Sequence, residues 1–367
     1  MNDEHGETDV PDRPVTVGLV TSVGRTLDAF FPAIVERLEE QGFCVSAASG
    51  TESRMPRWTR LDGFSQRPSL HVPTAIRAVR AWSREHDHDV VITNTATASA
   101  LVRAARLPAP VVYFCHGLHW NLETALSARP WQLVERALLP RTAAVITINR
   151  DDEAWFRRHA GPPVHRLRYG VGVPLDDYPA SGVPDGGPHL LWVGDFTPRK
   201  RPALAVAVIR QLVDRGCDVR LRMVGDGPLH ASVVREIAAQ GLADLIRADG
   251  RAPVAPALAS ATALLHTAEW EGLPRVALEA AAVGRWSYGF DVKGLRDAPL
   301  VRLVPDADVD ALARLIQDDD ARGALHDVPD VRSALSVTAA ADGIGAAILE
   351  TLGRPVPARQ DGGSPPR

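Results

Sequence analysis

Short runs of apolar, β-branched residues alternate with helical patterns along most of this chain. In the first half, strand-like runs at residues 15–21, 43–48 and 89–93 are separated by helical patterns at 27–41 and 76–85. Two further strand signals follow at residues 110–114 and 143–148. Alternation of strands with helices is typical of parallel sheets covered by helices on both faces. The sequence therefore predicts an α/β protein.

A stretch rich in Pro, Gly and Asp, residues 174–188, interrupts this alternation, which then starts again. Such a composition is typical of turns and linkers. The renewed alternation predicts strands at 189–193, 219–224 and 261–266 and helices at 203–215, 229–240 and 274–283. Two α/β halves of similar size predict a ligand site in the cleft between them.

A length of 367 residues suits two domains of ordinary size. The expected organisation is a disordered leader at 1–14, an N-terminal domain at 15–175, a linker at 176–188, a C-terminal domain at 189–352 and a disordered tail at 353–367. The leader is acidic and polar and has no apolar core, so it does not have the pattern of a secretory signal.

Composition narrows the class of protein. The formal net charge of -4 gives no general reason to expect a nucleic-acid partner. The three cysteines, Cys44, Cys115 and Cys217, lack metal-ligand spacing and fit a reducing cytoplasm. Cys115 is interpreted as a buried structural thiol. No apolar run approaches the roughly 18–20 residues that span a bilayer.

The segment 269–284, EWEGLPRVALEAAAVG, is the most informative. Gly272, Leu273 and Pro274 form a tight turn, and proline suits the first position of a helix. The free N–H groups at a helix N-terminus suit a diphosphate. Glu279 is expected to accept hydrogen bonds from ribose hydroxyls, and Glu271 from the hydroxyls of a transferred sugar. The alternative for both glutamates is a solvated helix face.

Two further turns carry candidate residues. After the strand at 189–193, a turn that begins at Gly194 bears Arg199, Lys200 and Arg201, which could neutralise a diphosphate leaving group. Its alternative is an exposed basic loop. In the segment 111–120, an apolar strand delivers His116 at its carboxyl end, where α/β proteins place ligands, although a lone histidine is often structural.

These motifs resemble those of the family 4 glycosyltransferases, retaining enzymes of the GT-B fold, in which two Rossmann-like domains face each other across a cleft. Glu271 to Glu279 is similar to their E-x7-E motif, and Gly194 to Lys200 to their G-R-x4-K turn. Residues 225–228 resemble their G-x-G-P/E turn, and the loop 291–294 corresponds as well. Residues 93–99, 116–120, 145–152 and 169–173 resemble the branch of capsular and exopolysaccharide enzymes that extend a polyprenyl-diphosphate-linked sugar.

The resemblance implies a role for each matching residue. Lys200 would bind donor phosphate, Glu279 the ribose and Glu271 the donor sugar, with His116 beside that sugar near the acceptor. Gly24 would belong to a loop that closes over the phosphates. Asp195 departs from the family, which often has arginine there; Arg199 or Arg201 could compensate for it.

The expected reaction moves a hexose or N-acetylhexosamine from a nucleotide sugar, preferably a UDP-sugar, to a hydroxyl of a lipid-linked saccharide. A departing phosphate oxygen can take the acceptor's proton, so no protein base is required; a covalent intermediate on Glu271 is the less favoured hypothesis. No cofactor and no metal are expected. The D-x-D patterns at residues 87–89, 306–308 and 308–310 are interpreted as structural, since Asp is a natural helix cap.

The segment 54–67 interleaves arginines with apolar residues. Arg54, Arg57, Trp58 and Arg60 could meet anionic lipid or a polyprenyl diphosphate, which would put the protein at the inner face of the plasma membrane. The alternative is a surface loop that packs its aromatics onto its own domain. Competing functions are a glycosyltransferase acting on a soluble natural product, a GT-B sugar-nucleotide epimerase and a non-catalytic sugar-nucleotide-binding protein.

Overall fold

The computed structural model describes residues 13–66, 70–118, 120, 126–159 and 161–356. Most of the expected leader and tail, together with Arg67 and His119, lie outside these ranges. The described chain contains two parallel sheets with helices between the strands, which confirms the predicted α/β class. It forms two compact units, one made of the described residues up to Val112 and from Ile348 onward, the other of Tyr113–Ala347. The expected boundary at 176–188 stays a prediction.

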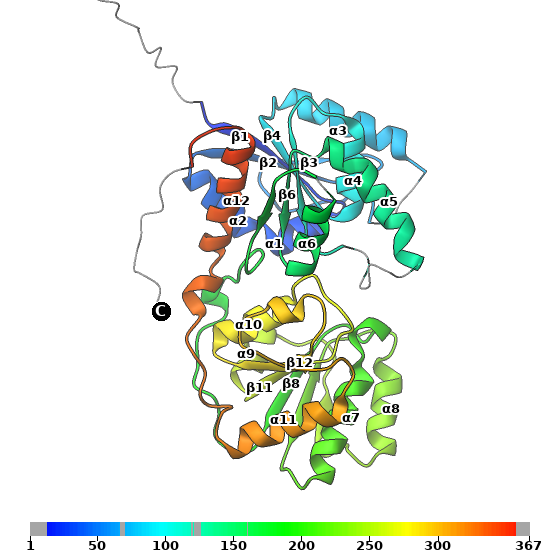
Figure 1. The fold of residues 1–367 in the computed structure, drawn as a ribbon, viewed down its shortest axis with the longest axis vertical. Coiled ribbons are helices and arrows are strands. Elements are labelled where there is room, and N and C mark those ends of the chain that lie inside the picture. Colours follow the sequence, from blue (N-terminus) through cyan, green and yellow to red (C-terminus); the bar gives the residue numbers. More distant parts are fainter. Residues whose placement is uncertain (1–12, 67–69, 119, 121–125, 160, 357–367) are drawn as a thin grey trace, which may run out of the picture. The chain divides into compact units, whose positions relative to one another are not determined.

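The first sheet has the strand order β3-β2-β1-β4-β5-β6-β7 (Figure 1). Its first strand is central, so the chain builds outward on one side and then crosses to the other. The strands are β1 (Val15–Val20), β2 (Phe43–Ser49), β3 (Trp58–Arg60), β4 (Val90–Asn94), β5 (Val111–Cys115), β6 (Ala144–Thr147) and β7 (Val164–Arg166). The accompanying helices are α1 (Gly24–Phe30), α2 (Pro32–Glu40), α3 (Val72–Glu85), α4 (Ala96–Ala105), α5 (Arg129–Leu138) and α6 (Arg150–Arg158).

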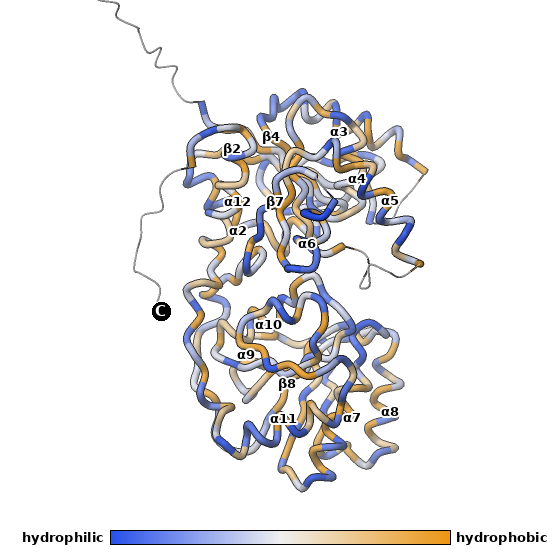
Figure 2. The backbone as a smooth tube through the Cα atoms, in the orientation of Figure 1, coloured by the Kyte–Doolittle hydropathy of each residue, from blue (hydrophilic) through white to orange (hydrophobic). Residues whose placement is uncertain are grey.

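The second sheet has the order β10-β9-β8-β11-β12-β13, again with its first strand inside. Its strands are β8 (His189–Val193), β9 (Arg220–Val224), β10 (Ile246–Ala248), β11 (Ala263–His266), β12 (Trp286–Phe290) and β13 (Val301–Val304). The helices α7 (Pro202–Asp214), α8 (His230–Ala239), α9 (Val254–Ala259), α10 (Arg275–Val283) and α11 (Val309–Ala321) cover it (Figure 1). Hydrophobic and hydrophilic segments alternate along α7 and α8, as expected of helices with one face on a core (Figure 2).

The helix predicted at 27–41 is two helices in the structure, α1 and α2, which meet at Phe31. Pro32 is the physical reason, because it has no N–H to donate to a carbonyl one turn earlier and so interrupts the hydrogen bonds of a continuous helix. The chain turns at Phe31, and Pro32 then starts α2 as a first-turn residue.

The basic and aromatic segment 54–67 holds a short strand, β3, instead of only a loop. Met55, Leu61 and Phe64 are buried, and the half-buried Trp58 donates its indole N–H to Ser49 Oγ at 2.8 Å. The arginines Arg54, Arg57 and Arg60 are exposed. The apolar side chains therefore pack onto their own unit, as the second of the two interpretations expected.

The expected linker is held in place by two arginines. A short 3-10 turn, Leu175–Asp177, lies at its start, and no further helix or strand follows in the described residues up to 188. Arg332 donates to the carbonyls of Leu175 and Tyr178, and the buried Arg285 donates to the Ser181 carbonyl at 2.8 Å. The last helix in the described part of the chain is α12 (Val337–Thr351).

Within the described residues, no helix is long and apolar enough to span a membrane. The three cysteines are free thiols, and Cys115 is buried as predicted. Burial raises the pKa of the Cys115 thiol, which keeps it protonated and unreactive.

Candidate functional site

The strand order of the second sheet reverses between β8 and β11. These two parallel strands are neighbours, although β9 and β10 come between them in the sequence. The carboxyl ends of β8 and β11 are Val193 and His266. Ligands of open α/β sheets bind at such a switch point, outside the carboxyl ends of the strands. The predicted residues Gly194, Lys200 and Glu271 all lie in loops that leave these two strands.

Glycines allow the loops at this edge to cross closely. Gly225 has φ +141°, and a Cβ on it would lie 1.9 Å from the carbonyl oxygen of Gly194. The Gly194 N–H donates to Val224 O at 3.0 Å, which ties the two loops together. Asp195, the departure from the family motif, is exposed, whereas the next residue, Phe196, is buried.

The three cations that follow have different surroundings. Arg201 donates to the carbonyls of Thr267 and Ala268 at 2.8 Å each and pairs with Asp306 at 2.7 Å. Its guanidinium is therefore committed to the loop after β11. Arg199 is more accessible, with 36% of its side chain exposed, and donates to Trp270 O at 2.9 Å. Of the two arginines that could compensate for Asp195, Arg199 is the better placed.

Glu271 lies between the cations. Its Oε1 is ion-paired with Lys200 Nζ, and its Oε2 lies 2.9 Å from Arg199 Nη1. Only 13% of the Glu271 side chain and 15% of that of Lys200 is exposed. Burial alone would raise the pKa of Glu271, but the charges of Lys200 and Arg199 outweigh it and hold that pKa below its usual value. The carboxylate is thus ionised, and the predicted basic turn is not a freely solvated loop.

The turn of Gly272, Leu273 and Pro274 leads into α10 as predicted, except that Pro274 caps the helix and Arg275 is its first residue. The first turn of α10 itself contains no acidic residue, so none of its own side chains opposes an anion at the N–H groups there. No side chain fits at Gly272, since a Cβ there would lie 1.8 Å from the carbonyl oxygen of His116.

Glu279 is buried, with 6% exposure, and its Oε1 accepts from Arg275 Nε at 2.9 Å. Burial and the hydrogen bond to Glu279 raise the pKa of the Tyr178 hydroxyl. Neither glutamate of the motif therefore lies on a solvated helix face, which excludes that alternative. A ribose that bound Glu279 would share it with Arg275 and Tyr178.

His116 follows β5, and the Gly272 contact places it beside the loop that carries Glu271 within the same compact unit. Gly117, with φ +132°, makes this approach feasible, because a Cβ on it would lie 3.0 Å from Gly272 Cα. Burial lowers the pKa of His116 to about 4, so its imidazole is neutral near pH 7. A neutral imidazole can donate or accept a hydrogen bond at a sugar hydroxyl.

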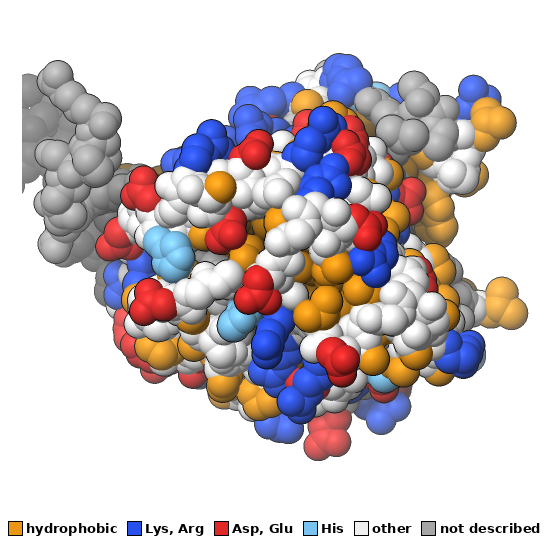
Figure 3. Space-filling model, turned by 90° about the horizontal axis from the view of Figure 1, so that it is seen from below, with side chains coloured by type: hydrophobic (Ala, Val, Ile, Leu, Met, Phe, Trp, Pro, Cys, Tyr) orange, Lys and Arg blue, Asp and Glu red, His pale blue; other side chains and the backbone are white. Residues whose placement is uncertain are grey.

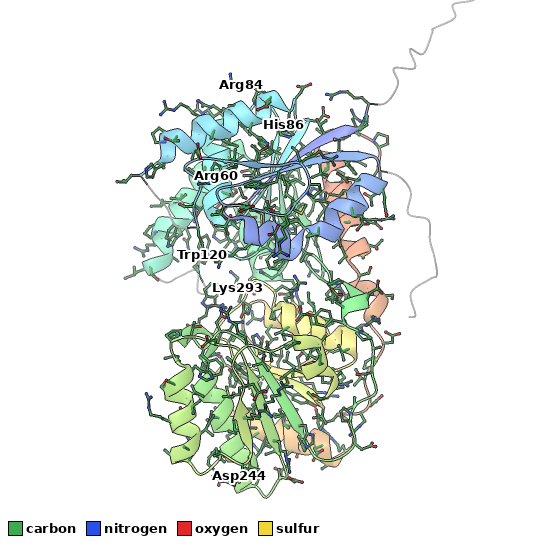
Figure 4. All side chains as sticks on the ribbon, turned by 180° about the vertical axis from the view of Figure 1, so that it is seen from behind. Arg60, Arg84, His86, Trp120, Asp244 and Lys293 are labelled. Atoms are coloured by element: carbon green, nitrogen blue, oxygen red, sulfur yellow. The ribbon has the colours of Figure 1, made fainter. Side chains whose placement is uncertain are left out.

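A buried ion pair, to which the sequence assigned no role, supports this arrangement. Lys293 Nζ lies 2.7 Å from Asp152 Oδ1, with 5% and 2% of the two side chains exposed. Lys293 also donates to Trp120 O at 3.1 Å, and Figure 4 shows these two residues beside each other. Asn149 Nδ2 donates to Asp152 at 2.8 Å and to Gly272 O at 2.9 Å. The pair braces the turn after His116 and the loop before α10.

Lysine occurs only twice in this sequence, at Lys200 and Lys293, among 41 basic residues. Both lysines belong to this site. Their scarcity elsewhere is a compositional signal that could have drawn attention to Lys293 from the sequence alone. His266, which sequence reasoning also missed, ends β11, and its Nε2 lies 3.9 Å from Glu271 Oε1.

The remaining predicted residues lie in the other compact unit. Gly24 donates its N–H to Thr51 Oγ1 at 2.9 Å, and a Cβ on it would lie 1.8 Å from the Glu52 carbonyl oxygen. Arg54, Arg57, Trp58 and Arg60 belong to that unit as well.

Each D-x-D pattern contains structural carboxylates. Asp89 accepts from Thr16 N at 2.8 Å, Asp308 caps α11 by accepting from Ala311 N at 2.9 Å, and Asp306 pairs with Arg201. In the part of the chain that the structure describes, no three His, Cys, Asp or Glu side chains gather as a metal site would require.

Two family matches cover most of the chain. Residues 30–170 match the glycosyl transferase 4-like domain, and residues 187–318 match the glycosyl transferases of group 1. The phosphatidyl-myo-inositol mannosyltransferase of Mycolicibacterium smegmatis is 28% identical over 68% of this chain and 68% of its own length. The 2-deoxystreptamine glucosyltransferase of Streptomyces kanamyceticus is 30% identical over 38% of this chain, which spans only 35% of that relative.

Solved structures agree in fold. Sucrose-phosphate synthase from Thermosynechococcus elongatus has a TM-score of 0.76 at 20% identity, covering 92% of this chain and 99% of its own. The HepE protein of Anabaena, in complex with UDP and glucose, has a TM-score of 0.70 at 16% identity, covering 92% of this chain and 100% of its own. The fold and the matched motifs define a GT-B glycosyltransferase. The chain belongs to the family 4-like glycosyltransferases of this fold.

Proposed function

We propose that this protein transfers a hexose or N-acetylhexosamine from a nucleotide sugar, preferably a UDP-sugar, to an acceptor hydroxyl with retention of configuration. The observation that carries the proposal is the cluster of Lys200, Arg199 and Glu271 at the switch point of the second sheet. It combines cations for a diphosphate with a carboxylate for sugar hydroxyls. The complex of HepE with UDP and glucose supports this pairing of ligands.

In the proposed reaction the bond from the anomeric carbon to the β-phosphate oxygen breaks while a bond to the acceptor oxygen forms. The acceptor's proton passes to the departing phosphate, so the nucleoside diphosphate takes up both the bonding electrons and the proton. Negative charge grows on the phosphate in the transition state, where Lys200 and Arg199 stabilise it. Glu271 and His116 hold the sugar, and the carboxylate need not form a covalent bond. No metal takes part in the proposed step.

For this step Lys200 has to move from Glu271 to the phosphate. The ion pair already holds the Lys200 ammonium beside Glu271, close to where the sugar would meet the diphosphate. This limits the reorganisation that binding requires. The N-terminal turn of α10 adds N–H groups for the same anion.

The proposed acceptor is a saccharide linked to a polyprenyl diphosphate, used by an enzyme that works in the cytoplasm at the inner face of the plasma membrane. The name of one relative contains a phosphatidyl lipid and that of the other a small aminocyclitol, so the comparisons support either a lipid or a soluble acceptor. A second candidate, glycosylation of a soluble natural product, is therefore favoured by a specific observation.

Exposed apolar side chains outside the segment 54–67 support the membrane contact. They gather on and before α5, at Leu126, Trp131, Leu133 and Val134, with 72%, 45%, 66% and 45% exposure. At about 100° per residue, Leu133 lies between the exposed Arg129 and Arg136 on one face of α5. An apolar centre flanked by arginines suits an anionic bilayer surface.

Vesicle sedimentation tests this contact. Leu133→Glu with Val134→Glu should abolish binding to vesicles of phosphatidylglycerol and phosphatidylcholine, whereas Val234→Glu on α8, which at 42% is exposed much as Val134 is, should leave it unchanged. Equal binding by all three proteins would remove the membrane contact from the proposal.

The function itself is tested by incubating the protein with UDP-, GDP- and dTDP-sugars, with and without a polyprenyl-diphosphate-linked sugar, and measuring released nucleotide and glycosylated product. Transfer to the lipid-linked sugar, with the anomeric configuration of the donor in the product, is expected. Turnover without transfer to that acceptor would favour the soluble acceptor or an epimerase, and binding without turnover a binding protein.

A further inference from the structure

His266 is a buried histidine without a hydrogen-bond partner at either ring nitrogen among the described residues. Only 3% of its side chain is exposed. A buried polar atom without a partner costs free energy, so native structures rarely retain one without a reason. His266 ends β11 at the switch point of the sheet, and its unpaired Nε2 lies near Glu271 in the candidate site itself.

The imidazole faces a particular atom. His266 Nε2 lies 3.9 Å from Glu271 Oε1, the same oxygen that pairs with Lys200 Nζ. The other oxygen of the carboxylate, Oε2, pairs with Arg199. His266 Nε2 therefore lies just beyond hydrogen-bond distance of a carboxylate oxygen that is paired with Lys200.

The position of His266 is fixed from two sides. The hydroxyl of Thr267, the next residue, accepts from Trp192 Nε1 at 2.9 Å and lies 2.9 Å from Lys200 O, to which it donates. Opposite His266 in the sheet is Gly289, where a Cβ would lie 2.5 Å from the His266 carbonyl oxygen. The end of β11 is thus tied to the loop that carries Lys200.

The imidazole is neutral at this position. Burial, followed by the charge of Lys200, lowers the pKa of His266 to about 3. A neutral imidazole still has one N–H to donate, and it does not compete with Lys200 and Arg199 for a phosphate.

We propose that His266 is a positioning residue, which takes over Oε1 of Glu271 when the donor diphosphate draws Lys200 away. The inference rests on the proposed function. Departure of Lys200 would leave one carboxylate oxygen of a nearly buried glutamate unpaired. An approach of roughly 1 Å would bring Nε2 to an ordinary N–H···O distance. Glu271 then stays oriented toward the sugar while the cations serve the phosphate.

This role predicts a difference between two ligands. Calorimetric titration of His266→Leu should show a modest loss of affinity for UDP, since UDP also draws Lys200 away from Glu271, and a loss at least about tenfold larger for UDP-glucose, because only the sugar depends on the orientation of Glu271. His266→Gln, which keeps a donor near Nε2, should retain most of the UDP-glucose affinity. Equal losses for both ligands, or equal behaviour of the two variants, would overturn the proposal.

A double-mutant cycle separates positioning from a general effect on folding. In a Glu271→Gln background, His266→Leu should cause little further loss of UDP-glucose affinity, because the two residues act through one contact. His88→Leu, at a buried histidine of the other compact unit, serves as a control and should leave the ratio of the two affinities unchanged. Additive losses in the cycle would contradict the inference. If the wild-type protein binds no nucleotide, the proposed function fails instead.

Discussion

At the scale of single residues, the site is defined by charges that are held together without a ligand. Glu271 pairs with both Lys200 and Arg199, and the carboxylate and the ammonium are mostly shielded from water. Such a cluster keeps each charged side chain in place before the substrate arrives, so binding exchanges partners instead of ordering free side chains. The surrounding histidines, His116 and His266, add hydrogen-bonding groups without adding charge.

Glu279 provides a test at this scale. Replacement of Glu279 by Gln should raise the donor KM about tenfold and change kcat little, because the ribose lies away from the bond that breaks. Steady-state kinetics with the donor found in the panel would measure both constants. Arg275→Gln is the matched variant, since it removes the present partner of Glu279. A larger loss of donor affinity in Arg275→Gln than in Glu279→Gln would indicate that Glu279 only holds the arginine.

The buried histidines make stability depend on pH. The pKa values of His88 and His116 are lowered to about 4, and that of His266 to about 3, mainly by burial. The unfolded chain, with histidine pKa values of about 6.5, binds more protons than the folded chain below that pH. Stability from these groups is thus present above pH 6.5 and lost as the pH falls toward 4.

We therefore expect Tm to fall between pH 7 and pH 5 in thermal unfolding followed by circular dichroism. His88→Gln removes one titrating group, which accepts or donates a hydrogen bond at Ser46 Oγ at 2.7 Å, and should flatten this dependence. A Tm that is constant or rises over the same interval would contradict the assignment of neutral, buried histidines.

At the scale of elements, loops from distant parts of the sequence converge on the start of α10. Asn149 and Asp152, at the beginning of α6, connect to Gly272 and Lys293 on either side of α10. The ion pair of Lys293 and Asp152 is almost fully buried. The cost of removing both charges from water offsets much of their attraction, so the pair contributes more to orienting the loops than to net stability.

Breaking this pair should be costly. Lys293→Met leaves the Asp152 carboxylate buried without its cation, and we expect a loss of about 3–5 kcal/mol in the free energy of unfolding. The double variant Lys293→Met with Asp152→Asn removes both charges and should recover part of that loss. Urea unfolding of the three proteins measures the difference. An equal or greater loss in the double variant would contradict a charge-pair mechanism.

Local patterns predict the elements well where one run of residues decides the outcome. The strand predicted at 189–193 is β8, and other strand ends differ by a residue or two, because β-branched runs mark the buried strands. The edge strand β3 was missed because it has only three residues, one of them an arginine, which is too short for a recognisable pattern. Lys200, Glu271 and His116 were found from motifs. His266 and the pair of Lys293 with Asp152 were missed because their roles depend on contacts between distant segments.

At the scale of the whole molecule, each sheet begins with a central strand and then crosses over it. This topology gives each sheet one switch point, and in the second sheet the cations, Glu271 and His266 all lie there. On the face presented in Figure 3, basic side chains gather in a few places among acidic, apolar and uncharged ones.

The measurement that tests this account most directly is the rate of nucleoside diphosphate release, with donor and acceptor present, for the wild type, Lys200→Met and a control, Arg235→Gln on α8. We predict a fall of about 10²-fold or more for Lys200→Met, because the ammonium stabilises the charge that grows on the leaving phosphate. The control should match the wild type. An unchanged rate in Lys200→Met would contradict the central claim that this cluster drives glycosyl transfer.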